Sequence, residues 1–157
     1  MTLGYDLYWS FRSPYSYMVT PRLQALEAEY DVVCNVRPVY PLAVRTPEFF
    51  DDRDPLWFSY FITDVFREAA YLGLPFRWPR PDPVQQAPGV GYRMEQPFIH
   101  RLTHLGVAAA ERGRGLEFLA EAGRTIWGGE AENWHQGDHL QKAAERAAAR
   151  RGAGPRE

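Results

Sequence analysis

The side chains best suited to chemistry are two serines, Ser13 and Ser16, separated by Pro14 and Tyr15. Their spacing is that of the cysteines in a Cys-Pro-x-Cys dithiol site, with an oxygen in place of each sulfur. A thiol at the first position would have a lowered pKa. A serine there cannot exchange disulfides, but it can hydrogen-bond the thiolate of a bound molecule. Ser13 also precedes a proline, as a helix N-cap does. Two roles are open: a cap alone, or a cap that also stabilises an anion at the positive end of a helix.

The elements that must position these serines are a strand before them and a helix after them. An aromatic-rich run favours a strand over residues 4–10. Apolar side chains at spacings of three and four predict an amphipathic helix over residues 14–30. The apolar side chains of this helix are Val19, Leu23, Leu26 and Tyr30. Residues 31–37 form a second predicted strand that Pro38 ends, so the sequence predicts a βαβ unit with two parallel strands.

The rest of the chain is predicted to be mainly helical. Residues 40–54 form a connector, and the helix that follows continues until Gly73 and Pro75 end it. Prolines and glycines recur through residues 76–96, which predicts a long loop that lies against the body and borders a site. Further helices are predicted over residues 97–112, 116–127 and 135–150.

Several short motifs, taken together, resemble those of one protein family. They are Ser13-Pro14-Tyr15-Ser16-Tyr17 after an aromatic strand, Arg37-Pro38-Val39 at the end of the next strand, Tyr60, Asp64, Arg67 and Ala69 on a helix that exits through Gly73 and Pro75, and Ile126-Trp127 before two glycines. In this order and spacing the chain resembles the 2-hydroxychromene-2-carboxylate isomerases, which are relatives of the kappa-class glutathione transferases and the DsbA-type oxidoreductases. The resemblance covers the chain up to about residue 147.

The resemblance implies an α/β, thioredoxin-like fold with a large helical insertion. On this basis residues 1–45 are the N-terminal βαβ part of a thioredoxin-like domain, residues 46–150 are the helical insertion domain, and residues 151–157 are a disordered tail. We expect the second half of the thioredoxin fold to be missing. The family's later loop, whose backbone grips glutathione opposite the nucleophile position, has no counterpart in the sequence.

The resemblance also implies a site and a cofactor. Glutathione would bind with its sulfur against Ser13, which we take as the catalytic residue. The residues expected to bind glutathione or the substrate are Arg12, Pro14, Tyr15, Arg53, Tyr60 and Asp64. Family members often carry an asparagine and a lysine just before the helix of Tyr60, whereas this stretch offers Arg53 as its only cation.

The expected activity is glutathione-dependent isomerisation of an aromatic-degradation intermediate such as 2-hydroxychromene-2-carboxylate, by reversible thiolate addition and rotation. Two alternatives stay open. One is conjugation, in the manner of a kappa-class glutathione transferase. The other is a non-catalytic binding or remnant protein, because half of the expected glutathione site is absent.

Composition narrows the classes of partner. A net charge of −2 offers no electrostatic case for nucleic acid or an anionic membrane, and 45% hydrophobic residues indicate a folded protein. The N-terminus lacks a signal-peptide pattern, so we expect a cytoplasmic protein with a small-molecule substrate. A homodimer is implied by the resemblance alone.

Other constellations point to structure rather than chemistry. The histidine pairs His100/His104 and His135/His139 have the i,i+4 spacing of zinc ligands on a helix, but neither has a third ligand at a clear spacing. We therefore expect no metal site. Cys34, the only cysteine, follows two valines in the second predicted strand and is expected to pack there.

We predict that the 157-residue chain is inactive as a dithiol oxidoreductase, because Cys34 has no partner and the two serines cannot form a disulfide. In an insulin-reduction assay driven by a small thiol, the rate should equal the background rate. A rate above background that disappears in Cys34→Ser would show that Cys34 is reactive.

Overall fold

The computed structural model describes residues 2–150 and begins with the predicted βαβ unit. Strand β1 (Leu3–Trp9) leads into helix α1 (Pro14–Glu29), and β2 (Val32–Pro38) returns parallel to β1. Leu3 pairs with Val32 and Trp9 with Pro38, so the two strands are in register over their whole length. The predicted strand–helix–strand order and the parallel pairing are confirmed.

The rest of the described chain is helical apart from one long loop. The elements in order are α2 (Leu42–Arg45), the 3₁₀ helix η1 (Pro47–Phe50), α3 (Pro55–Tyr71), α4 (Ile99–Glu111), α5 (Gly115–Trp127) and α6 (His139–Ala149). Residues 40–54, predicted as a plain connector, therefore contain two short helices. The last helix begins at His139, so His135 lies outside it and the predicted helical pair His135/His139 is wrong. The tail predicted over residues 151–157 lies outside the described residues.

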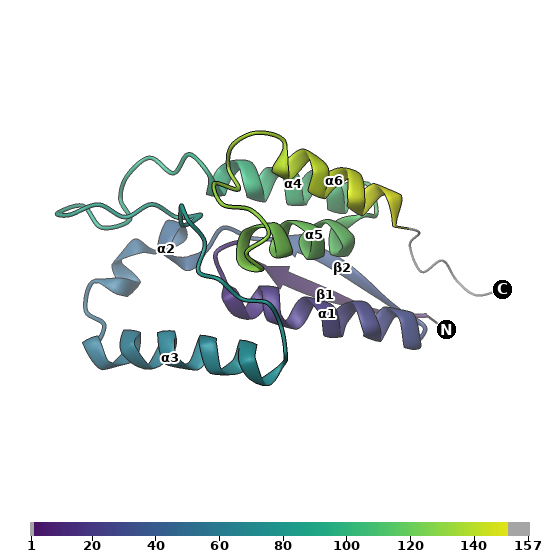
Figure 1. Cartoon of the computed structure of the whole chain (residues 1–157), viewed down its shortest axis with the longest axis horizontal. Coiled ribbons are helices and arrows are strands. Elements are labelled where there is room, and N and C mark those ends of the chain that lie inside the picture. Colours follow the sequence, from purple (N-terminus) through teal and green to yellow (C-terminus); the bar gives the residue numbers. More distant parts are fainter. Residues whose placement is uncertain (1, 151–157) are drawn as a thin grey trace.

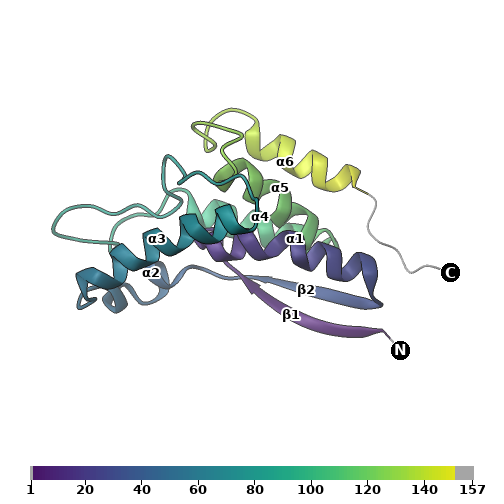
Figure 2. The same ribbon diagram turned by 60° about the horizontal axis from the view of Figure 1, so that its bottom comes forward.

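The molecule is a mixed α/β structure in which the helices gather on one side of a small sheet. Figure 2 shows the two strands below and α1, α4, α5 and α6 above them, with α6 outermost. Helix α5 packs on α1, α4 and β2, and α6 packs on α5 (Figure 1). The burial of the strands alternates accordingly: Leu7, Trp9 and Val36 face the helices, while Tyr8 and Val33 are exposed on the other face.

No helix among residues 2–150 is both long enough and apolar enough to span a membrane.

Helix α1 lies where it was predicted but buries a different face. Its buried residues are Pro14, Tyr17, Met18 and Thr20. Val19, Leu26 and Tyr30 are exposed, and only Leu23 of the predicted apolar set packs against the core. The reason is tertiary: the indole Nε1 of Trp9 donates to the carbonyl of Ser16 at 2.8 Å, and the Tyr17 ring lies against Gly123 of α5. These contacts turn the Tyr17 face of the helix inward.

The core is built around the segment that joins β1 to α1. Phe11 is fully buried, with its ring centroid 4.7 Å from that of Trp9 and 6.2 Å from that of Phe118. Its carbonyl accepts a hydrogen bond from the indole of Trp127 on α5, at 3.0 Å. The helical block and the strand–helix junction therefore share one core.

A buried carboxylate joins the last two helices. Glu121 of α5 is fully buried and pairs with Arg124 of its own helix, with Arg146 of α6 at 2.7 Å and with Arg150 just after α6 at 2.8 Å. Burial alone would raise the pKa of Glu121, but hydrogen bonds from Arg146 and Arg124 hold it below its usual range. The ionised carboxylate thus fixes α6 on the outer side of α5.

The start of α5 packs closely against β2, and a substitution there can test this contact. A Cβ added to Gly115 would lie 2.7 Å from the Cβ of Val36 in β2 and 3.2 Å from the backbone of Ala110. We predict that Gly115→Ala lowers the free energy of unfolding by about 1–3 kcal/mol through overpacking. Denaturant unfolding of both proteins would measure the change.

The matched control is Gly4→Ala in β1, where the added Cβ would meet its nearest neighbours at 3.7 Å and 3.9 Å. Its stability should change by less than about 0.5 kcal/mol. A Gly115→Ala protein as stable as this control would contradict the contact of α5 with β2.

Candidate functional site

Ser13 is the N-cap of α1, as its sequence predicted. Its side-chain oxygen accepts a hydrogen bond from the backbone N–H of Ser16 at 3.2 Å, and Pro14 occupies the first turn. The hydroxyl hydrogen of Ser13 has no acceptor among residues 2–150. Since a hydroxyl can accept and donate at once, Ser13 can cap the helix and still offer a donor to a ligand.

An aromatic cavity of about 300 Å³ opens beside Ser13. One wall consists of Ser10, Arg12, Ser13 and Pro14, and another consists of residues between Val39 and Arg45. The remaining wall is aromatic and comes from η1, α3 and the long loop. The aromatic lining residues are Tyr40, Phe49, Phe50, Trp57, Phe58, Phe61 and Tyr92. Tyr92 belongs to the loop that was expected to border a site.

The aromatic wall is held by contacts between its own rings. Trp57 and Phe61, one turn apart on α3, stack with centroids 5.6 Å apart and planes at 4°. Phe50 makes an edge contact with Tyr92 at 5.3 Å. Such pairs add stability beyond the area that they bury. These contacts hold the rings in place, so the wall offers a fixed surface that suits a flat, apolar ligand.

Arg12 lines the cavity, but its charge is already compensated. Its Nε lies 2.7 Å from the carboxylate of Asp82, and its guanidinium stands 5.3 Å from the ring centroid of Trp78. Burial raises the pKa of Asp82, while the Arg12 charge opposes that rise. The sequence suggested Arg12 as a ligand-binding cation, whereas the structure shows it anchoring the long loop.

Arg53 lies outside the cavity lining. Its Nε donates to the carbonyl of Phe49 at 2.9 Å, and its guanidinium covers the Phe49 ring at 3.6 Å. Arg53 thus supports the back of the aromatic wall. Arg12 is paired with Asp82 and Arg53 lies outside the lining, so neither cation named from the sequence offers an uncompensated charge to the cavity.

Tyr15 and Asp64 come together beside the cavity rather than in its lining. The Tyr15 hydroxyl donates to the Asp64 carboxylate, and the Tyr15 ring meets Phe61 edge-on at 5.9 Å. Burial, together with the hydrogen bond to Asp64, raises the pKa of Tyr15 well above its usual range. The pair therefore links α1 to α3 with a protonated phenol.

Tyr60 is 65% exposed and does not line the cavity. The resemblance implied that the helix of Tyr60 lines the pocket near Ser13. Helix α3 does line it, but through Trp57, Phe58 and Phe61 at its N-terminal end. Sequence reasoning also missed Tyr40, Arg45, Phe49 and Phe50. The one available signal was the pair of adjacent phenylalanines in a stretch that otherwise looked like a connector.

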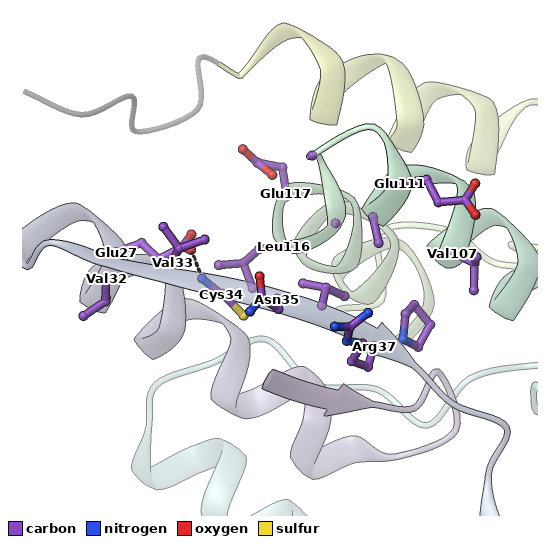
Figure 3. A pocket seen from close by; sticks show the side chains of 15 residues that line it. Glu27, Val32, Val33, Cys34, Asn35, Arg37, Val107, Glu111, Leu116 and Glu117 are labelled. Carbon is purple, nitrogen blue, oxygen red and sulfur yellow. Dashed lines mark hydrogen bonds between the residues drawn. The ribbon is translucent and has the colours of Figure 1, made fainter. Parts of the chain in front are cut away.

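A larger cavity of about 620 Å³ lies along β2, between the strand and helices α4 and α5. Figure 3 shows Cys34 in its lining, with Glu27 of α1 accepting a hydrogen bond from the Cys34 backbone N–H at 2.6 Å. Burial raises the pKa of the Cys34 thiol, which disfavours a thiolate. The first turn of α5 borders this cavity, but its lining contains no aromatic side chain and three carboxylates, so we place the candidate site beside Ser13.

Among residues 2–150, no three or more His, Cys, Asp or Glu side chains gather as a metal-binding group. Of the predicted helical histidine pairs, His100 and His104 both lie on α4. There the Nε2 of His104 is hydrogen-bonded to the hydroxyl of Tyr40 at 2.9 Å, and His100 meets the Tyr40 ring edge-on. These histidines support one wall of the cavity.

Comparison of the chain with protein-family models, with curated proteins and with solved structures finds no match.

The cap geometry predicts the stability of Ser13 variants. Ser13→Ala removes the acceptor of the Ser16 N–H and should lower the free energy of unfolding by about 0.5–2 kcal/mol. Ser13→Thr keeps the hydroxyl and should recover most of that loss. Thermal or denaturant unfolding of the three proteins measures it.

The control is Ser59→Ala, an exposed serine within α3 whose side chain makes no hydrogen bond to residues 2–150. It should leave stability unchanged or raise it slightly, since alanine is the better helix former. Equal effects of Ser13→Ala and Ser59→Ala on the free energy of unfolding would show that the Ser13 side chain does not stabilise α1 as a cap.

Proposed function

We propose that the chain has a thioredoxin-like fold and is a glutathione-dependent isomerase of an aromatic-degradation intermediate such as 2-hydroxychromene-2-carboxylate. The observation that carries the proposal is the Ser13 hydroxyl. It caps α1 through its oxygen, keeps its hydrogen uncommitted among residues 2–150, and borders the aromatic cavity. The parallel βαβ unit with a helix N-terminus after the first strand supports the fold.

The N-terminus of α1 is suited to hold a thiolate. The positive end of the helix dipole favours negative charge there, and the backbone N–H of Tyr15 is the first-turn amide without a partner among residues 2–150. The Ser13 hydroxyl adds a neutral donor, which can bond a sulfur anion without competing for its proton at neutral pH. A serine in this role lowers the pKa of a bound thiol and forms no covalent bond itself.

The cavity suits the substrate. Its volume of about 300 Å³ is at the small end of ligand pockets, and its aromatic wall can stack on a conjugated ring system. When bound, glutathione would supply a thiolate that adds reversibly to a conjugated double bond and so permits rotation about it. The chain's own part is to stabilise negative charge at Ser13 and to hold the ring against the wall of Trp57 and Phe61.

Conjugation of glutathione to an aromatic electrophile is the second candidate, because it would use the same thiolate and the same apolar cavity. The two activities differ in their product. An isomerase returns glutathione unchanged, and a transferase consumes it. A binding protein without catalysis would show neither.

The test is turnover of 2-hydroxychromene-2-carboxylate by the 157-residue chain with and without glutathione, followed by chromatography of the products. We expect glutathione-dependent isomerisation with no loss of glutathione. Removal of one donor to a developing anion typically lowers turnover by about 100- to 1,000-fold, and we expect Ser13→Ala to do so.

Ser13→Thr is the matched control, because it keeps a hydroxyl at the same place and should retain most of the activity. Unchanged turnover in folded Ser13→Ala would overturn the role of the serine. Stoichiometric loss of glutathione would favour the transferase. No binding of glutathione by calorimetry would reject both.

A further inference from the structure

The charged residues of the cavity lining are Arg12 and Arg45, and carboxylates are absent from it in the part of the chain that the structure describes. Arg12 is neutralised by Asp82. The cavity therefore has one cation whose charge nothing in its lining balances. That cation is Arg45, the last residue of α2.

The surroundings of Arg45 leave its guanidinium accessible. The residue is exposed, and its side chain makes no hydrogen bond or ion pair with any other residue in 2–150. Asp51, which follows η1, is already paired with Arg93 of the long loop. Arg45 itself has no carboxylate partner among residues 2–150, so the fork of donors on its guanidinium remains available at the edge of an aromatic cavity.

We propose that Arg45 binds the carboxylate of the ligand whose planar apolar part lies against the aromatic wall. A guanidinium offers two parallel N–H donors that match the two oxygens of a carboxylate. One uncompensated arginine balances one negative charge, which matches the single carboxylate of the substrate in the proposed function. This inference deepens the proposed function and rests on it for the location of the substrate, because it uses the same cavity.

The division of labour within the cavity follows from its construction. Ser13 stands on the α1 wall and Arg45 on the α2 wall, with Trp57, Phe58 and Phe61 from α3 also in the lining. Arg45 would bind the carboxylate of the substrate, and Ser13 would hydrogen-bond the thiolate at the N-terminus of α1. Arg45 therefore determines which substrate is accepted, while the thiolate site does not require it.

The experiment titrates 2-naphthoate and its neutral analogue 2-naphthamide into the 157-residue chain by calorimetry, without glutathione. We expect 2-naphthoate to bind about tenfold more tightly than the amide, as one charge-assisted contact allows. Arg45→Gln should remove that advantage and leave 2-naphthamide binding unchanged. Arg45→Lys should restore only part of it, because an ammonium cannot make the paired contact.

Arg101→Gln is the matched control, because Arg101 is an exposed arginine on α4, outside the lining, whose side chain has no hydrogen bond or ion pair with residues 2–150. It should leave the preference for 2-naphthoate over the amide intact. Thermal unfolding of each variant confirms that it is folded. Equal binding of both probes by the unsubstituted chain, absence of 2-naphthoate binding, or an undiminished preference in Arg45→Gln would each overturn the proposal.

A separate titration with glutathione distinguishes a failure of the role proposed for Arg45 from a failure of the proposed function. A chain that binds 2-naphthoate through Arg45 but binds no glutathione supports the carboxylate site and rejects the isomerase. A chain that binds glutathione and shows no preference for 2-naphthoate keeps the thiolate site and rejects the role of Arg45.

Discussion

The burial of Phe11 is the constraint on which the rest of the structure depends. Its ring fills the space between Trp9, Phe118 and α4, where a Cβ on Gly106 would lie 2.9 Å from it. Its carbonyl is held by the indole of Trp127. Because both the side chain and the backbone of Phe11 are fixed, the turn that follows has little freedom. Ser13, two residues later, begins α1 at a position that the helical block determines.

Arg12, the residue that follows Phe11 in this turn, helps to shape the cavity. Phe11 points into the core, and Arg12 reaches Asp82 and Trp78 instead. This contact draws the long loop onto the body and brings Tyr92 to the aromatic wall. The cost of desolvating a guanidinium is offset by the carboxylate and the indole face together. Arg12, next to Ser13 in the chain, thus shapes the site by holding the long loop.

The sequence correctly predicted the features that depend on residues close together in the chain. The Ser-Pro cap, the two parallel strands and the proline-rich loop follow from backbone preferences and were predicted correctly. The buried face of α1 was predicted wrongly, because Tyr17 is turned inward by Gly123, more than a hundred residues later in the chain. The partner of Arg12 lies seventy residues away at Asp82. No periodicity within either segment could have predicted these distant pairs.

The two roles weighed for Ser13 from the sequence do not exclude each other. Capping uses a lone pair on the hydroxyl oxygen, which accepts from the Ser16 N–H. Anion stabilisation would use the hydroxyl hydrogen, which the cap leaves free. The bond to Ser16 also restricts the rotation of the Ser13 side chain, so the position of its hydroxyl oxygen is fixed before any ligand arrives. Such preorganisation is what makes a hydrogen-bond donor effective on a developing charge. The structural role of Ser13 therefore supports the chemical role proposed for it, and both depend on the turn that the burial of Phe11 fixes.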